Sequence, residues 1–372
     1  MAIVCGAVGV ELLLMAYLGE RTYYDALRAV RFGRDIVAGT LSIHTDVDNT
    51  KTFIGPVLWF QIYAGVGVWG LKAFNLISFA AMALSHRAMG RGLFGARVTL
   101  VALFFLCFYP GTHRNVVAGE LDDNLAALLL TLAMLVLVRS GRHISAALIL
   151  GVAFLFKFWS AIFVVGLLLH LMLERRWRLA MATALAAAAP FVALDLLSGG
   201  AGTAAFVASI QKQGSISSWS LIGTRLLTTG LAPCFLLAGW AVLRQPDANR
   251  RLLFLVPAPY LLYVVVMQDA HAVTFVMMAC LVTWSYLIAE LVLDLLPRGL
   301  QAATLAAYLL LGVAIAVQHL HRDTVLFDLG TESSIESSLG SSRVFGRPST
   351  AAAGVDPSRR PALGSGACWE IV

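Results

Sequence analysis

The chain has 372 residues, of which 59% are hydrophobic and 13% are charged, and its mean hydropathy is +0.81. Charged residues are about half as frequent as in a soluble globular domain, which excludes that class. The net charge of +6 does not indicate a nucleic-acid partner, because the arginines stand in small clusters between apolar runs. Such clusters orient membrane proteins. We therefore predict an all-α, polytopic membrane protein, since lipid cannot satisfy an unpaired backbone.

Apolar runs recur from the first residue to His321. A spanning helix needs about 20 apolar residues, and on this basis we predict about eleven spans. Residues 1–321 form the membrane domain, whereas Ser, Gly and Pro in residues 322–372 predict a disordered tail. The first run has no basic segment before it, which favours an uncleaved helix over a signal peptide. The predicted spans lie near residues 1–18, 67–85, 97–110, 124–138, 144–156, 159–173, 178–197, 226–243, 252–267, 272–293 and 300–319.

The orientation follows from the positive-inside rule. With the N-terminus in the cytoplasm, every short inner loop is basic, and the acids fall in the opposite, external loops. The basic loops carry Arg87, Arg91 and Arg97; Arg139 and Arg142; Arg175, Arg176 and Arg178; Arg244, Arg250 and Arg251; and Arg298.

The first external loop, residues 19–66, is a long polar stretch between two strongly apolar segments. One helical face within it is apolar and the opposite face is charged, which predicts an amphipathic helix along the membrane surface. Gly55-Pro56 breaks the chain, and Val57 to Trp69 is predicted to be a second surface or re-entrant piece. The apolar face carries Tyr23, Ala26, Leu27, Val30, Gly33 and Val37.

Two acids of this loop are candidates for a general base. In a glycosyl or phosphoryl transfer, the acceptor must lose a proton as it attacks. Glu20 or Asp25, held at a water-facing membrane boundary, can take this proton. The alternative for Asp25 is an ion pair with Arg21 or Arg28 at helical spacing.

A second candidate site in this loop is Asp46-Val47-Asp48, followed by Lys51. Two aspartates at this spacing can hold a divalent cation or a sugar hydroxyl, and a lysine nearby can contact a phosphate. The alternative is a turn stabilised by its own aspartate side chains. The five cysteines include no C-x-x-C pair and no metal-site spacing.

A third group of acids comprises Glu120, Asp122 and Asp123, preceded by Arg114. Three neighbouring carboxylates repel one another unless they meet a cation, a substrate or an arginine. The alternative is that Asp122 and Asp123 only cap the following span, since a helix N-terminus favours negative charge.

Lys157 follows a predicted span of residues 144–156. Thirteen residues cover roughly 20 Å of a hydrocarbon core about 30 Å thick, so the turn at Lys157 should lie below the outer surface, in a water-filled cavity. A buried lysine in a membrane protein is a functional candidate, and a phosphate would compensate its charge. The alternatives are snorkelling or pairing with an acid of the second external loop, residues 198–225.

Three features together resemble the GT-C glycosyltransferases, which are multi-spanning enzymes that use polyprenyl-phosphate sugars. They are the first span with its long loop opening GERTYYDALRA, the segment GELDDNLAALLLTLAMLVLVRSGRHISAALILGVAFLFK, and the paired short spans around Lys157. The resemblance covers roughly residues 1–180. Within the superfamily the chain most resembles the mannosyltransferases that use polyprenol-phosphate mannose and related bacterial enzymes.

The resemblance implies inverting transfer on the external face, with an acid of the first external loop as the base. Glu20 matches the acid that precedes a Y-x-x-A segment, here Tyr23 to Ala26. An aspartate is commoner there, which leaves Asp25, Asp46 and Asp48 as competitors.

Lys157 matches the basic residue that would hold the lipid phosphate, aided by Lys51 or Arg114. The partners implied are a polyprenyl-phosphate sugar, a lipid or glycan acceptor and the lipids of a bacterial plasma membrane. No cofactor is required, although a divalent cation fits. The sugar hydroxyls would be bound by Glu120, Asp122 and Asp123.

Two other functions are compatible with the sequence. A transporter or flippase of a lipid-linked or anionic solute is one, but transporters commonly show repeated halves, and none is visible here. A non-catalytic membrane partner is the other.

Overall fold

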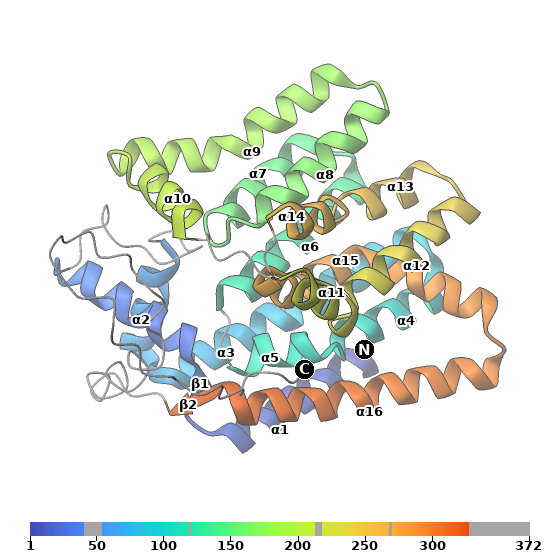
Figure 1. Ribbon diagram of the computed structural model, residues 1–372, viewed down its shortest axis with the longest axis horizontal. Coiled ribbons are helices and arrows are strands. Elements are labelled where there is room, and N and C mark those ends of the chain that lie inside the picture. Colours follow the sequence, from blue (N-terminus) through green and yellow to red (C-terminus); the bar gives the residue numbers. More distant parts are fainter. Residues whose placement is uncertain (41–53, 119–120, 213–217, 268–269, 327–372) are drawn as a thin grey trace, which may run out of the picture. The chain divides into compact units, whose positions relative to one another are not determined.

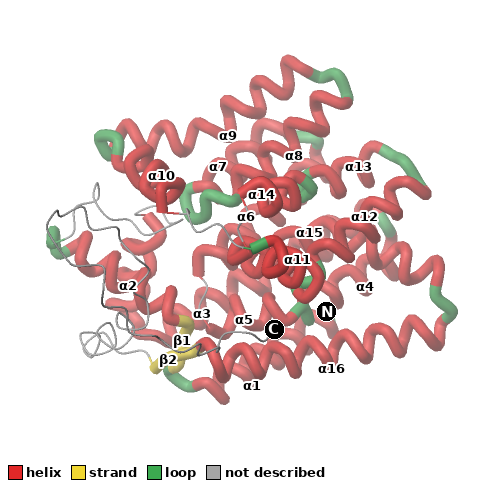
Figure 2. The backbone as a smooth tube through the Cα atoms, viewed as in Figure 1, coloured by secondary structure: helices red, strands yellow, loops and turns green. Residues whose placement is uncertain are grey.

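The computed structural model describes residues 1–40, 54–118, 121–212, 218–267 and 270–326, all within one compact unit that ends at Phe327. This part of the chain is almost entirely helical, as predicted (Figures 1 and 2). In chain order the elements are α1 (Ala2–Leu18), β1 (Arg21–Tyr23), α2 (Tyr24–Val37), α3 (Ile54–Leu93), α4 (Gly95–Cys107), α5 (Pro110–Ala118), α6 (Leu121–Ser140), α7 (His143–Phe154), α8 (Ser160–Leu173), α9 (Trp177–Leu197), α10 (Ala201–Lys212), α11 (Trp219–Thr228), α12 (Leu231–Arg244), α13 (Ala248–Leu255), α14 (Pro259–Met267), α15 (Ala270–Leu295), α16 (Arg298–Asp323) and β2 (Thr324–Leu326).

Six spans among the described helices are long and apolar enough to cross a membrane. The number rises to eight if the bent pairs α4 with α5 and α11 with α12 each form one span, with bends of 57° and 60°. Three shorter apolar helices, α1, α7 and α8, accompany them. The chain is therefore a multi-pass membrane protein, while the predicted total of about eleven spans stays a prediction.

The turns between spans fall at two ends of the helical unit. Figure 1 shows the turns α8 to α9, α12 to α13 and α15 to α16 at one end, and α2, α10 and the strand pair at the other. The turns of the first group carry three of the predicted arginine clusters, namely Arg175 to Arg178, Arg244 to Arg251 and Arg298, and Met1 Sδ accepts a hydrogen bond from Arg87 near the end of α3. The side of the membrane that each end faces stays a prediction.

The amphipathic helix predicted in the first external loop is α2, and its apolar side packs against α3. Ala26, Leu27 and Val30 are buried, whereas Val37 at the end of the predicted face is exposed. At Gly33 the helices approach so closely that a Cβ atom would lie 1.9 Å from the carbonyl oxygen of Pro56.

The piece predicted as a second surface or re-entrant segment, Val57 to Trp69, is mostly the first arm of α3, which ends at the break at Gly67. Trp59 within it is fully buried, whereas Val66 is 70% exposed, so only the first part of this arm packs inside the protein. The predicted chain break is also displaced. Gly67 interrupts α3 with φ 72° and ψ −165°, a conformation that is accessible essentially only to glycine.

A short strand pair, which the sequence did not predict, joins the two ends of the described chain. β1 pairs antiparallel with β2, and Tyr23 lies opposite Thr324. Arg21 Nη2 also donates a hydrogen bond of 2.9 Å to the carbonyl oxygen of Thr324. The start of the first external loop is thereby fixed to the end of α16.

Candidate active site

The candidate site is centred on the N-terminus of α6, where Asp122 and Asp123 are buried. Trp59 Nε1 donates to Asp122 Oδ1 at 2.5 Å, and Trp159 Nε1 donates to Asp123 Oδ1 at 2.9 Å. Lys157 Nζ lies 3.1 Å from Asp123 Oδ2. Two carboxylates are thus held by side chains from α3 and from the turn between α7 and α8.

The electrostatics explain how these carboxylates tolerate burial. Both lie in the first turn of α6, where the helix dipole favours negative charge. The side chains of Lys157 and Asp123 are 8% and 0% exposed, so each charge depends on the other. Asp123 thus combines a place in the first turn of α6 with an ion pair, and the described partner of Lys157 is this acid of α6.

The backbone approaches the site at Gly55, where a Cβ atom would lie 2.7 Å from Asp122 Oδ1. A side chain at this position would displace the carboxylate from Trp59. The first turn of α3 therefore forms one wall of the site.

Two buried asparagines connect α3, α5 and α6 below the carboxylates. Asn124 Nδ2 donates to the backbone oxygen of Asn75 at 2.8 Å. Asn75 Nδ2 in turn lies 3.4 Å from the carbonyl oxygens of Asn115 and Val116 in α5. These bonds fix the position of α5, which carries Arg114, relative to the acids of α6.

Arg114 contacts the first external loop through Tyr23. Its guanidinium carbon lies 4.6 Å from the centre of the tyrosine ring, and its Nη2 donates to the tyrosine hydroxyl. A guanidinium group suits phosphate recognition because it can donate two parallel hydrogen bonds.

A further buried cation, Lys72, lies in the second arm of α3. Its Nζ donates to the carbonyl oxygen of Gly19 at 2.7 Å, and Glu20 follows directly in the chain. Glu20 itself is exposed. One candidate base thus lies at the C-terminal end of α1, accessible to solvent.

The acid inside the first span, Glu11, forms a buried pair with His113 of α5. Glu11 Oε1 lies 2.6 Å from His113 Nδ1, and both side chains are 0% exposed. The pair joins α1 to α5, which agrees with the interhelical hydrogen bond expected of an acid at this depth.

The structure therefore brings together some of the predicted site residues. Asp122, Asp123 and Lys157 form one cluster, while Arg114 and Glu20 border the first external loop. The Asp25 backbone belongs to α2, but its side chain lies outside what the structure describes. The other predicted site residues that lie outside the described residues are Asp46, Asp48, Lys51 and Glu120.

Sequence reasoning missed several residues of the site. They are polar or aromatic residues within or beside apolar runs, and a polar residue at membrane depth is the signal that could have found them. These residues are Trp59, Lys72, Asn75, Asn124 and Trp159.

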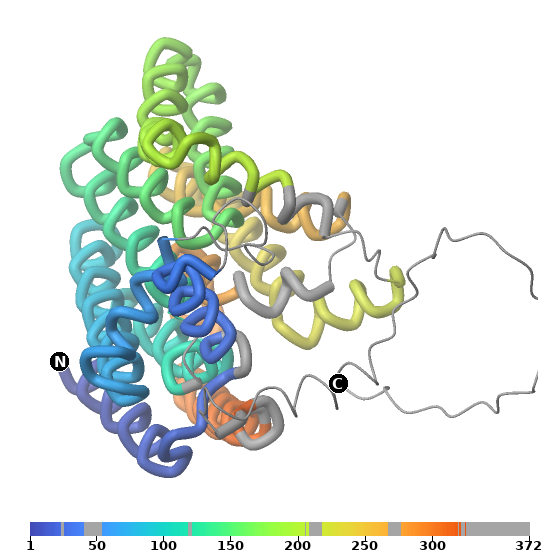
Figure 3. The backbone as a smooth tube through the Cα atoms, turned by 90° about the vertical axis from the view of Figure 1, so that its left-hand side faces the viewer, coloured from blue at the N-terminus to red at the C-terminus, as the bar shows by residue number. Residues whose placement is uncertain are grey.

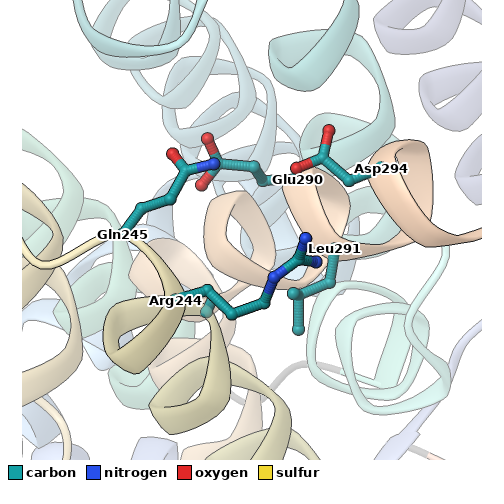
Figure 4. A pocket seen from close by; sticks show the side chains of 6 residues that line it. Arg244, Gln245, Glu290, Leu291 and Asp294 are labelled. Atoms are coloured by element: carbon teal, nitrogen blue, oxygen red, sulfur yellow. The ribbon is translucent and has the colours of Figure 1, made fainter.

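No group of three metal-ligating side chains occurs among the described residues, so a divalent cation stays an untested expectation. A small hollow of about 10 Å³ lies at the opposite end of the protein, beside the arginine-rich turns (Figure 4). Arg244 and Gln245 line it from the end of α12, and Glu290, Leu291 and Asp294 line it from α15. It is far too small for a sugar and separate from the predicted site.

Comparison with known proteins identifies a solved structure of similar fold. No protein-family model and no curated protein matches the chain. The crystal structure of ArnT from Cupriavidus metallidurans bound to undecaprenyl phosphate matches with a TM-score of 0.59 and 18% sequence identity. The match covers 82% of this chain but 63% of ArnT, so this chain spans less than two thirds of that protein's length. By its fold, the chain is similar to this ArnT structure.

Proposed function

We propose that the chain is a membrane glycosyltransferase that moves a sugar from a polyprenyl-phosphate carrier to an acceptor hydroxyl. The observation that supports this function is the buried Asp123 and Lys157 pair at the N-terminus of α6, within a GT-C fold. A structural neighbour, ArnT, was crystallised with undecaprenyl phosphate, which is the product that such a donor leaves behind.

The reaction is a single displacement with inversion at the anomeric carbon. The acceptor oxygen forms a bond to this carbon while the bond from the carbon to the phosphate oxygen breaks. The acceptor proton passes to a carboxylate of the protein, and the leaving polyprenyl phosphate gains one negative charge. A cation near the phosphate stabilises this charge as it develops.

Lys157 supplies that cation in our proposal, helped by Arg114 and Lys51. In the structure Lys157 is held by Asp123, so the donor phosphate would share or replace this carboxylate as its partner. Asp122 and Asp123 then accept hydrogen bonds from sugar hydroxyls.

The base is Glu20, with Asp25 and Asp48 as competitors. Glu20 is exposed at the end of α1, where an acceptor arriving from water can meet it. We propose that this end faces the external side of a bacterial plasma membrane, and that the sugar is a hexose or pentose, with mannose favoured.

The test is sugar transfer from purified polyprenyl-phosphate mannose and related donors. Glu20→Gln, Asp25→Asn and Asp122→Asn are compared with wild type, and loss of the base should slow transfer by about 100-fold or more. The control is Asp35→Asn, since Asp35 is paired with the neighbouring Arg34 at 3.0 Å on the open side of α2. Full activity in all three test variants would contradict the proposal. A parallel assay with a metal chelator shows whether a divalent cation is needed.

A further inference from the structure

Four exposed arginines lie in two turns at the end of the protein opposite the candidate site. Within the described ranges, none of their side chains forms a hydrogen bond or an ion pair. The neighbouring Arg251, in contrast, is paired with Glu174 at 3.1 Å. The charge of the four arginines, which we call the basic patch, is therefore available to an anion from outside the protein. The basic patch consists of Arg142, before α7, and Arg175, Arg176 and Arg178, around the start of α9.

A close contact between α7 and α9 places the two turns at about the same height. A Cβ atom at Gly151 of α7 would lie 2.2 Å from the carbonyl oxygen of Ala187 in α9, so the two helices touch there. Arg142 and Arg178 each lie nine residues before this contact. Because both helices run away from the arginine-rich end and rise about 1.5 Å a residue, the two arginines lie at a similar level.

The turn from α8 to α9 holds an arginine where the backbone favours glycine. Arg175 has φ 57°, in the left-handed region, and the next N–H, of Arg176, donates to the carbonyl oxygen of Leu171 at 2.9 Å. This arrangement ends many helices, and glycine is the usual residue at its left-handed position. An arginine there is unfavourable for the backbone, which indicates a use for its side chain.

Beside the basic patch, α9 presents an apolar face to its surroundings. Trp177, Met181 and Leu185 follow one another at intervals of four residues, and all three side chains are mostly exposed. This spacing places them on one face of the helix. A tryptophan at the end of such a face is typical of the boundary between the hydrocarbon core and the lipid headgroups. The headgroup of a lipid that lies along this face is therefore at the level of the basic patch.

We propose that the basic patch binds the headgroup of an anionic phospholipid whose acyl chains pack along the apolar face of α9. Guanidinium groups suit this ligand because they donate paired hydrogen bonds to phosphate oxygens. A zwitterionic lipid also carries a phosphate, but its own ammonium group offsets the negative charge. The proposal is independent of sugar transfer, since all its residues lie away from the candidate site.

The test measures lipid binding by native mass spectrometry of the full chain in detergent. The protein is titrated with phosphatidylglycerol or with phosphatidylcholine of the same acyl chains, and wild type should bind phosphatidylglycerol more tightly. Arg176→Gln with Arg178→Gln should weaken the binding of phosphatidylglycerol by about tenfold or more, because each removed arginine lowers the attraction to an anionic headgroup. The binding of phosphatidylcholine should change little. Each single substitution provides the same comparison if the double variant does not fold.

The matched control is Arg91→Gln with Arg298→Gln. These two arginines are also exposed, and they lie at the end of α3 and the start of α16. This variant should keep an affinity for phosphatidylglycerol within about twofold of wild type, because attraction to a headgroup falls off over a short distance. Arg176→Lys with Arg178→Lys keeps the charge and should retain most of the binding.

Three results would overturn the proposal. The first is an unchanged affinity for phosphatidylglycerol when Arg176 and Arg178 are replaced by glutamine. The second is an equal loss in the control variant, which would show that the lipid responds to the net charge of this end and not to the basic patch. The third is full competition by inorganic phosphate, which would show that the ligand is a free anion and not a lipid.

Discussion

The ion pair of Asp123 and Lys157 is costly to break because both side chains are buried. Asp123→Asn leaves the ammonium without its carboxylate, and we expect the free energy of unfolding to fall by about 3 kcal/mol. Thermal unfolding in detergent measures the change. The control is Glu174→Gln, since Glu174 and Arg251 also pair at 3.1 Å but with side chains 31% and 49% exposed. That variant should lose less than about 1 kcal/mol.

A double variant separates the structural and chemical roles of this pair. Asp123→Asn with Lys157→Met removes both charges, so most of the lost stability should return. Activity should not return, because no cation is left for the phosphate. Recovery of sugar transfer in the double variant would show that Lys157 does not bind the donor phosphate, and continued instability would show that Asp123 is held mainly by other partners.

Asp247, which lies just before α13, is another carboxylate that pairs with a basic side chain, that of Arg250. Burial alone would raise its pKa, but the backbone N–H and the guanidinium of Arg250 hold the pKa below its ordinary value. A carboxyl with a lowered pKa adds stability above its unfolded pKa and loses it as pH falls through the folded pKa. We therefore expect Asp247→Asn to be less stable than wild type in thermal unfolding at neutral pH. The two proteins should have the same thermal stability in acid, where the carboxyl of Asp247 is protonated.

At the scale of elements, the packing of α2 on α3 depends on Gly33. Gly33→Ala would place Cβ 1.9 Å from the carbonyl oxygen of Pro56 and 2.7 Å from Cβ of Phe60, so the helices must separate. We expect a loss of about 1–3 kcal/mol in thermal unfolding, and slower sugar transfer since Gly55 and Trp59 shift with this arm. Gly9→Ala in α1 is the matched control, because nothing lies within 4 Å of its added Cβ.

The strand pair gives a second prediction for an element. A chain that ends after Asp323 lacks β2 and the acceptor of Arg21, whereas a chain that ends after Phe327 keeps both. The shorter chain should transfer sugar about tenfold more slowly or worse, because the segment from Glu20 to Tyr23 is no longer held. Equal rates for the two chains would show that the strand pair does not position the loop.

The sequence predicted the elements better than it predicted their contacts. The apolar period of α2 and the short α7 before Lys157 are local patterns, and both were confirmed. The bond from Trp59 to Asp122 joins residues 63 positions apart, and no local period contains it. Lys72 and Asn75 lie within an apolar run, and their partners in α1, α5 and α6 are 40 or more positions away in the sequence.

At the scale of the whole molecule, the described site and the arginine-rich turns lie at opposite ends of the helical unit. Figure 3 views the end that carries α2, which lies over the first arm of α3. At the other end, Arg250 binds Glu290 through two hydrogen bonds of 2.9 and 2.5 Å and lies over the ring of Phe94. Arg250 at the basic end thus makes structural contacts with neighbouring side chains. The candidate catalytic and substrate-binding residues lie at the other end, which carries the acids and the lysines.

This division predicts the sidedness of the protein, which two exposed tryptophans can report. Trp177 begins α9 beside an arginine cluster and is 59% exposed, while Trp219 begins α11 in the second predicted external loop and is 58% exposed. In a background without the native cysteines, Trp219→Cys should react with a membrane-impermeant maleimide from outside intact cells. Trp177→Cys should react only after the membrane is opened, because basic loops stay in the cytoplasm. The reverse pattern would place the Asp123 and Lys157 site on the cytoplasmic side, and the acceptor would then have to be a cytoplasmic molecule.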